Sequence, residues 1–189
     1  DILGLPCYPD ITSLPGTPEL AVVVVPAPFV GAVAEECGKK GARGMIVISA
    51  GFKEAGAEGK KREQDLVAIM KKYGMRLIGP NCLGLIDVVH NLNASFAFET
   101  PPKGRIAFIS QSGALGTAVL DWAMKEGVGF SKFFSVGNMA EVSESDLVEA
   151  LGEDPDTDVI LLYVEGIKDG RRFVEVARKV TKVKPVIVV

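Results

Sequence analysis

Short apolar runs alternate with amphipathic segments along most of the chain. The first run, Ala21–Val25, is continuous and rich in β-branched residues, and the segment that follows it, Phe29–Lys40, carries Phe29, Val33 and Cys37 at intervals of four. A continuous β-branched run is typical of a strand buried on both faces, and a spacing of four indicates a helix with one buried face. The pattern therefore predicts a strand followed by an amphipathic helix.

The same alternation continues to residue 78. Met45–Ser49 and Arg76–Ile78 are predicted as strands, and Lys60–Tyr73 between them is predicted as a helix. A β-α-β-α-β order favours parallel pairing through right-handed crossovers. The first part of the chain is thus expected to form an open parallel sheet.

Between Gly79 and Pro102 this regularity stops, because Asn, Gly and Pro are dense and no helical period survives, although Leu92–Phe98 fits a short extended piece. A second series of strands and helices then follows: Arg105–Ile109, Ala114–Glu126, Phe130–Ser135, Ser143–Leu151, Val159–Val164, Arg171–Val180 and Val186–Val189. The sequence therefore predicts an α/β protein of two tandem open parallel-sheet units, residues 1–98 and 99–189. In such sheets, ligands bind beyond the carboxyl ends of the strands.

Composition narrows the class of protein. The 189 residues carry a net charge of −3, which provides no basic field for nucleic acid. No apolar run approaches the roughly 20 residues that span a bilayer, and no leader is visible ahead of the first strand. The three cysteines are an odd number at unrelated spacings, which argues against a disulfide framework or a zinc site and favours the cytoplasm. We expect no nucleic-acid partner and no membrane.

The strongest candidate site follows the strand Arg105–Ile109, where Ser110, Gln111, Ser112 and Gly113 lead into a helix. Unpaired N–H groups and the positive end of the helix dipole suit an anion, most naturally phosphate. Glu165 ends a neighbouring strand and should lie at the same sheet edge, although a carboxylate there is also commonly a solvated or capping residue.

Two further clusters lie at strand ends in the first unit. Ser49, Ala50 and Gly51 form one, in which a glycine permits close approach of a ligand, and a plain β-to-α loop explains these residue types equally well. Asn81 and Cys82 form the other, in a rigid turn that also fits an interdomain hinge. A nucleophilic Cys82 would need a base that the sequence does not supply.

Several enzyme classes are disfavoured. A serine hydrolase elbow requires Gly at positions 110 and 114, where this chain has Ser110 and Ala114, and the only histidine, His90, precedes Ser112 instead of following it. No G-x-G-x-x-G follows a strand, and no Walker A lysine is present. His90 lies in a polar loop, and metal binding by it alone is disfavoured.

Several short motifs follow one another in a fixed order along the chain: Leu3–Pro9, Ala50–Glu54, Pro80–Gly84, Leu92–Phe96, Lys103–Ala107, Ser110–Leu115, Ser135–Asn138 and Tyr163–Gly166. In their residues and their order, these motifs resemble the ADP-forming acyl-CoA synthetases, relatives of the α subunit of succinyl-CoA synthetase. The resemblance covers essentially the whole chain. It implies a truncated Rossmann-like CoA-binding domain over 1–98 and a flavodoxin-like succinyl-CoA-ligase domain over 99–189.

The resemblance also implies an activity. Acyl-CoA and phosphate would give acyl phosphate and free CoA, and a histidine would carry the phosphoryl group to ADP, bound with Mg on an ATP-grasp unit outside this chain. When the family's functional residues are assigned to the matching positions of this chain, Ser49, Ala50 and Gly51 would line the CoA site. Asn81 and Cys82 would lie near the thioester.

In the same family, Ser110, Gln111, Ser112 and Gly113 would hold phosphate, and Glu165 would orient the histidine as the catalytic carboxylate. The implied partners are a small carboxylic acid and an ATP-grasp β subunit or fused domain, in an oligomer. The family's Gly-rich loop lies before Asp1, and its phosphorylated histidine lies after Val189, so the chain is expected to be an internal portion that is inactive alone. The alternative is a non-catalytic CoA or small-ligand sensor module of a protein acetyltransferase.

Overall fold

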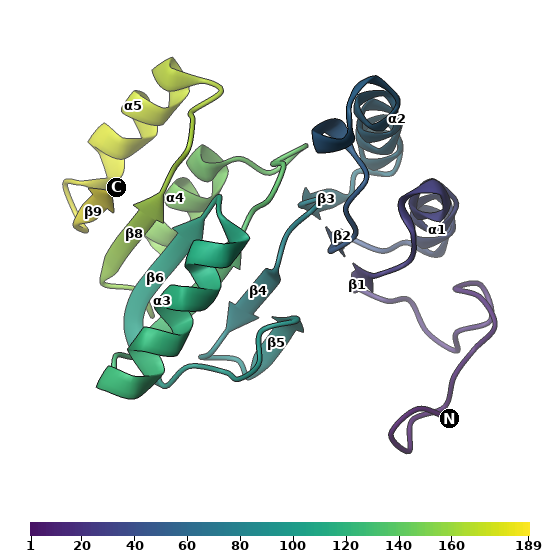
Figure 1. The fold of residues 1–189 in the computed structure, drawn as a ribbon, viewed down its shortest axis with the longest axis horizontal. Coiled ribbons are helices and arrows are strands. Elements are labelled where there is room, and N and C mark those ends of the chain that lie inside the picture. Colours follow the sequence, from purple (N-terminus) through teal and green to yellow (C-terminus); the bar gives the residue numbers. More distant parts are fainter.

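Two β-sheets stand side by side in the computed structural model, which describes residues 1–189 (Figure 1). The first sheet has three parallel strands in the order β1-β2-β3. Its elements are β1 (Leu20–Val23), α1 (Ala27–Lys40), β2 (Gly44–Val47), the 3-10 turn η1 (Lys53–Ala55), α2 (Ala57–Tyr73) and β3 (Arg76–Ile78). The predicted parallel β-α-β-α-β order is confirmed here.

Helix α1 begins where proline favours it and ends at a glycine. Pro28 lies in its first turn, where a missing N–H costs no hydrogen bond, and Gly41 at its end has φ +89°, a left-handed conformation. Its inner face buries Val30, Ala34 and Cys37 completely against the sheet. The predicted amphipathic helix is thus present, two residues longer at its start.

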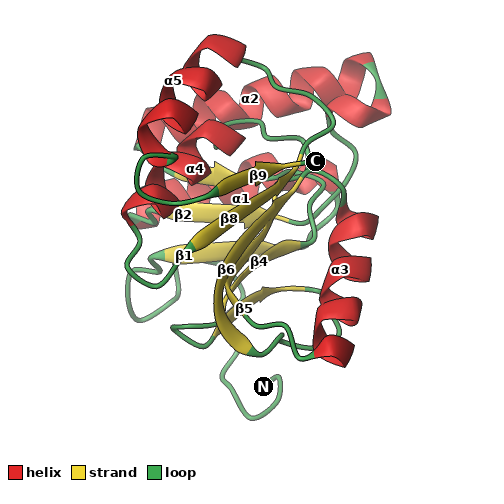
Figure 2. Cartoon of the chain, turned by 90° about the vertical axis from the view of Figure 1, so that its left-hand side faces the viewer, coloured by secondary structure: helices red, strands yellow, loops and turns green.

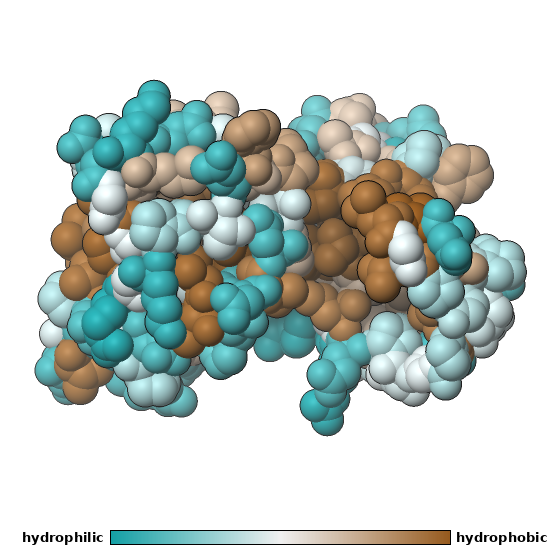
Figure 3. All heavy atoms as spheres, turned by 90° about the horizontal axis from the view of Figure 1, so that it is seen from below, coloured by the Kyte–Doolittle hydropathy of each residue, from teal (hydrophilic) through white to brown (hydrophobic).

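The run Ala21–Val25 is not buried on both faces, contrary to the prediction. Val22 is 45% exposed and Val24 is 71% exposed, because β1 is the outer strand and both helices of this unit lie on one side of the sheet (Figure 1). Apolar groups accordingly gather on the surface of this half of the molecule (Figure 3).

The second sheet has six strands in the order β5-β4-β7-β6-β8-β9. They are β4 (Gly84–Asp87), β5 (Leu92–Ser95), β6 (Lys103–Ser110), β7 (Phe130–Ser135), β8 (Val159–Tyr163) and β9 (Val186–Val188). β6 to β9 are parallel, but β4 runs antiparallel to both β5 and β7. Within the predicted second unit, 99–189, the four strands are parallel as expected. The antiparallel hairpin of β4 and β5, which the sequence pattern did not reveal, extends the sheet at one edge.

The hairpin strands belong to the second sheet although they precede residue 98. Residues 84–95 fall within the predicted first unit, yet every strand partner of β4 and β5 is in the second sheet. The exact division of the chain into units stays a prediction.

Helices cover both faces of the second sheet (Figure 2). α3 (Gly113–Glu126) packs on one face with Phe108 and Phe133, while α4 (Glu144–Glu153) and α5 (Gly170–Val180) pack on the other with Ala107 and Ile109. Successive residues of β6 thus point to opposite helical layers, as the period of two in a strand requires. None of the helices is both long and apolar enough to cross a membrane.

The segment between β7 and α4 joins the two sheets. The N–H groups of Asn138, Ala140 and Val142 donate to the carbonyls of Pro80, Gly79 and Leu77, at 2.9, 2.9 and 3.2 Å. The Glu141 carboxylate accepts from the Leu77 N–H at 2.8 Å. The free edge of β3 is therefore paired with backbone of the second unit.

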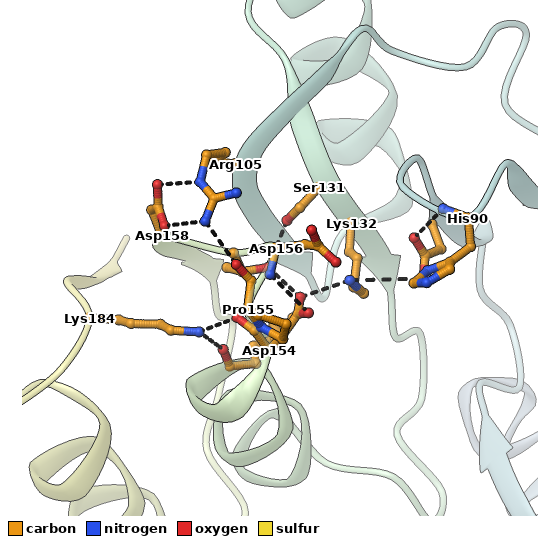
Figure 4. A network of polar contacts seen from close by, with 12 residues as sticks. His90, Arg105, Ser131, Lys132, Asp154, Pro155, Asp156, Asp158 and Lys184 are labelled. Carbon is orange, nitrogen blue, oxygen red and sulfur yellow. Dashed lines mark hydrogen bonds and ion pairs between the residues drawn. The ribbon is translucent and has the colours of Figure 1, made fainter.

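A buried ion pair lies at the amino ends of the strands of the second sheet (Figure 4). Lys132 Nζ lies 2.7 Å from Asp154 Oδ2, and both side chains are only 14% exposed. Thr157 donates to the same carboxylate oxygen at 2.7 Å. His90 also lies at this edge, with Nδ1 2.9 Å from Asp87 Oδ2.

Candidate functional site

A cavity of about 800 Å³ lies between the two sheets, lined by residues that follow β2, β3, β6, β7 and β8. Since parallel strands direct their carboxyl ends to one edge, loops from both units meet here, as expected for open α/β sheets. The cavity gathers six of the predicted site residues: Ala50, Asn81, Cys82, Gln111, Gly113 and Glu165. Four others do not line it: Ser49, Gly51, Ser110 and Ser112.

Ser110, Gln111 and Ser112 shape the start of α3. Ser110 is completely buried, and its hydroxyl donates to the Ser112 carbonyl at 2.7 Å. Ser112 is the N-cap of α3, and its Oγ accepts from the Leu115 N–H at 3.3 Å. The Ser110 hydroxyl both donates and accepts within the loop, and the Ser112 hydroxyl accepts there, so both help to fix its shape.

The backbone at the helix start remains available. Gly113 and Ala114 line the cavity, and as first-turn residues their N–H groups have no partner within α3. A Cβ added at Gly113 would meet no atom within 4 Å, so the space above this glycine is open. Two N–H donors at the positive end of a 14-residue helix thus face an open cavity, which suits an oxyanion.

Gln111 connects this loop to Glu165. Its Oε1 accepts from the N–H groups of Glu165 and Gly166 at 2.7 and 3.1 Å, and its Nε2 donates to the Gly166 carbonyl at 2.9 Å. The carboxylate of Glu165 itself makes no hydrogen bond and lines the cavity. The structure therefore places a free carboxylate beside the start of α3, as predicted from their common sheet edge.

The first unit contributes a rigid wall. Ser49 Oγ donates to the Val25 carbonyl at 2.5 Å, and the Ser49 carbonyl accepts from the Asn81 N–H at 3.0 Å. Gly51 has φ +102°, and its N–H donates to Glu54 Oε1 at 2.6 Å. These bonds tie the loop after β2 to the loop after β3, and leave the Asn81 side chain on the cavity surface.

Cys82 does not fit the role of a nucleophile. Its Sγ donates to the Val47 carbonyl at 3.3 Å, and burial raises the pKa of its thiol to about 12. At pH 8 only about one thiol in ten thousand would be ionised.

Cysteine alkylation tests this assignment. In the folded chain, iodoacetamide at pH 8 should modify Cys7, which is exposed, and leave Cys82 and Cys37 unmodified, because both are buried and burial raises their pKa. Mass spectrometry of peptides before and after unfolding in urea measures the sites. Rapid labelling of Cys82 in the folded state would contradict the assignment.

The cavity also contains polar residues that the sequence reasoning did not assign. Lys53, Glu54 and Asn138 line it, together with the aromatic ring of Phe96. Lys53 and Glu54 belong to the cluster after β2, and Asn138 belongs to the motif after β7, so the motifs contained the signal. The loop conformations determine which side chains reach the cavity. The pattern of hydrophobic and polar residues along the sequence does not reveal these conformations.

Asn138 is buried and lies at the centre of a polar cluster. Its Nδ2 donates to Glu54 Oε2 at 2.6 Å and to Glu63 Oε2 at 2.7 Å, and its Oδ1 accepts from Asn81 Nδ2 at 3.4 Å. Burial disfavours the charge on Glu54, but hydrogen bonds from Asn138 and from the Phe52 and Gly51 N–H groups outweigh it and hold the pKa of this carboxyl below its usual value. Asn138 therefore joins one carboxylate oxygen of Glu54 to one of Glu63.

The fold and the cavity define an α/β protein of two sheet-based units with a ligand site between them, and known families match both units. Residues 1–87 match the family described as "CoA binding domain", and residues 103–189 match "Succinyl-CoA ligase like flavodoxin domain".

Individual relatives agree with these matches. The chain is 54% identical over 188 residues to "Acetate--CoA ligase [ADP-forming] I" of Archaeoglobus fulgidus, covering 100% of this chain and 27% of the relative. It is 52% identical over 187 residues to "Acetate--CoA ligase [ADP-forming] II subunit alpha" of Pyrococcus furiosus, covering 99% of this chain and 41% of the relative.

A solved structure has the same fold. The dinucleotide-forming acetyl-coenzyme A synthetase 1 of Ca. Korarchaeum cryptofilum, in complex with phosphate and ADP, superposes with a TM-score of 0.96 at 41% identity, over 100% of this chain and 41% of that one. Over its whole length the chain is similar to ADP-forming acyl-CoA synthetases, and its two halves match these two domain families. It spans about a quarter to two fifths of the length of the curated relatives it matches.

Proposed function

We propose that this chain is the CoA- and phosphate-binding portion of an ADP-forming acid–CoA ligase. The observation that carries the proposal is the pair of free N–H groups of Gly113 and Ala114, which lie on the same cavity wall as the unengaged Glu165 carboxylate. The cavity of about 800 Å³ is within the size range of sites for small molecules and cofactors.

In the proposed reaction, a phosphate oxygen attacks the thioester carbonyl of acyl-CoA, the carbon–sulfur bond breaks, and CoA leaves as acyl phosphate forms. The N–H groups of Gly113 and Ala114 would hold the oxyanion through this step, since fixed donors at a helix start stabilise negative charge without reorganising. A histidine from outside residues 1–189 would then take the phosphoryl group, with Glu165 orienting its ring through a hydrogen bond. The carboxylic acid is released, and phosphoryl transfer to ADP yields ATP.

The roles of the other wall residues follow from this reaction. Ala50 and Asn81 would contact CoA, with Ser49 and Gly51 shaping their loop, and Cys82 would lie near the thioester as a neutral thiol. Ser110, Gln111 and Ser112 would hold the phosphate loop in shape. ADP and ATP with Mg would bind on an ATP-grasp unit, fused or separate, and the name of the Pyrococcus furiosus relative as an alpha subunit supports such a partner.

Three further aspects are proposed with it: a small carboxylic acid as substrate, an oligomeric assembly, and a cytoplasmic location. The location is supported by three free cysteine thiols, which suit a reducing compartment. The ligase names of the relatives favour this function over a sensor module of a protein acetyltransferase.

Replacing Gly113 tests the phosphate site. Gly113→Leu should weaken the binding of inorganic phosphate by more than about tenfold, because the new side chain occupies the open space over the helix start. Glu165→Gln should strengthen phosphate binding several-fold, since it removes a negative charge from beside the anion. Isothermal titration calorimetry of the 189-residue chain with phosphate measures both.

Gly170→Leu is a matched control. Gly170 is the first residue of α5, and a Cβ there also meets no atom within 4 Å, but it does not line the cavity. We expect phosphate affinity unchanged in this variant. If Gly113→Leu binds phosphate as tightly as the unsubstituted chain does, the start of α3 is not the phosphate site and the proposed function fails at this point.

A further inference from the structure

Two lysines from different units contact one carbonyl oxygen at the edge of the cavity. Lys53, in η1, and Lys168, in the loop between β8 and α5, both donate from Nζ to the backbone carbonyl of Asn138, Lys168 at 3.3 Å. Lys168 also donates to the Met139 carbonyl at 2.5 Å. The two ammonium groups are therefore neighbours, although like charges repel.

Neither ammonium group forms an ion pair with a carboxylate. Glu54 accepts from Gly51, Phe52 and Asn138, and Glu63 accepts from Asn138 Nδ2 and, more weakly, from the Lys53 N–H. The buried Glu144 also attracts the Lys168 charge, and its Oε2 has no hydrogen-bond partner. The two positive charges thus lie close together, and neither is in direct contact with a carboxylate.

The hydrogen-bond capacity of the pair is also incomplete. An ammonium group has three N–H donors, so Lys53 with one acceptor and Lys168 with two retain donors for a further ligand. Lys53 is the only cationic side chain on the cavity wall, where Glu54 and Glu165 are negative. Lys53 is therefore the one side chain on this cavity wall that can offer a positive charge to an anionic ligand.

The shared carbonyl allows Lys53 to turn toward a ligand. If Lys53 leaves the Asn138 carbonyl, Lys168 still donates to it, so the buried acceptor is not left without a partner. Burial and the neighbouring Lys53 charge both lower the pKa of Lys168. An anion bound between the two lysines would offset the repulsion between their charges.

We propose that Lys53 and Lys168 form a second anion subsite at the edge of the cavity, which binds a phosphate-type oxyanion by charge-assisted hydrogen bonds. The inference rests on the proposed function, which brings phosphate and CoA to this cavity. The shared chemistry is a phosphate group with two negative charges, and its source is either inorganic phosphate or a phosphate of CoA. Lys53 and Lys168 are binding residues in this scheme.

Binding measurements on the 189-residue chain test the subsite. Lys53→Met and Lys168→Met should each weaken the binding of the anion by about tenfold, the loss expected when one charge-assisted hydrogen bond is removed. Lys53→Arg should retain most of the affinity because it keeps the charge. Lys60→Met is the matched control, since Lys60 is an exposed lysine of α2 whose side chain has no partner, and it should leave affinity unchanged.

Three ligands identify the source of the anion. A loss for inorganic phosphate assigns the subsite to free phosphate. A loss for CoA that is absent for phosphate assigns it to CoA, and comparison with 3′-dephospho-CoA shows whether the 3′-phosphate is the bound group. Either pattern supports the inference.

A purely structural role for the lysines gives a different result. If both Met variants bind phosphate and CoA as the unsubstituted chain does, and only their melting temperatures without ligand fall, the pair merely joins the units and the inference is overturned. Failure of the unsubstituted chain to bind either ligand also overturns it. If Gly113→Leu abolishes phosphate binding while the lysine variants leave all ligands unaffected, the proposed function survives and the subsite does not.

Discussion

Gly137→Ala should lower the free energy of unfolding by about 3 kcal/mol. Gly137 follows β7 and has φ +53°, and a Cβ there would lie 2.3 Å from the Asn81 carbonyl oxygen and 2.4 Å from that of Pro80. Both obstacles are backbone atoms and cannot rotate away, so the two units would have to separate. Urea unfolding followed by circular dichroism measures the loss.

Gly127→Ala separates the two causes of this effect. Gly127, which follows α3, has φ +69°, but a Cβ added there would meet no atom within 4 Å, so alanine incurs only the cost of a left-handed backbone, about 1 kcal/mol. We expect Gly137→Ala to be clearly the more destabilising of the two. Equal losses would mean that the contact with the first unit adds nothing to stability.

Lys132→Met should lower the free energy of unfolding by about 2 kcal/mol at pH 7, because it leaves the Asp154 carboxylate mostly buried without its cation. Burial opposes the charge on Asp154, but hydrogen bonds from Lys132 and Thr157 outweigh it and hold the pKa of this carboxyl below its ordinary value.

The pH dependence of this loss follows from that lowered pKa. A lowered pKa in the folded state contributes stability above the ordinary pKa of about 4, and this contribution disappears as the pH falls through the folded value. The difference between Lys132→Met and the unsubstituted chain should therefore be largest near neutral pH and shrink as the pH falls below the ordinary pKa of a carboxyl group. Thermal unfolding at a series of pH values measures it, and a difference that grows toward acid pH would contradict the explanation.

An exposed pair provides the control for Lys132. Arg105 contacts Asp158 through Nη2 to Oδ1 at 2.8 Å, close to the same network, but its side chain is 54% exposed (Figure 4). Water solvates these charges in both the folded and the unfolded state, so Arg105→Gln should leave the unfolding curve nearly unchanged.

The sequence predicted most helices and parallel strands because their buried faces repeat with a clear period. Ser143 and Asp146, a capping signal in the sequence, form a complete capping box at the start of α4. β4 was missed because Gly84–Asp87 has only four residues in a segment dense in turn formers. Its place in the sheet depends on pairing with β7, and a pairing between distant segments leaves no local period.

The candidate site was predicted to a similar extent. The strand-to-helix turn at Gly113 and the carboxylate of Glu165 could be placed at one edge because parallel strands share a direction. Ser112 caps α3, whereas Gly113 faces the cavity. These different roles depend on the backbone geometry of the turn, which the residue types alone do not determine. Lys53 reaches Asn138 across 85 positions of sequence, and no spacing rule predicts such a contact.

The backbone bonds between the segment after β7 and the edge of β3 have a consequence for selectivity. Because Ala140 and Val142 are bonded to Gly79 and Leu77, the distance between the cavity's walls is set when the chain folds. A ligand then loses little entropy in ordering the protein, and a molecule of the wrong width finds walls that do not adapt. We infer that the cavity discriminates among ligands by preorganised shape, before any closure of surrounding segments.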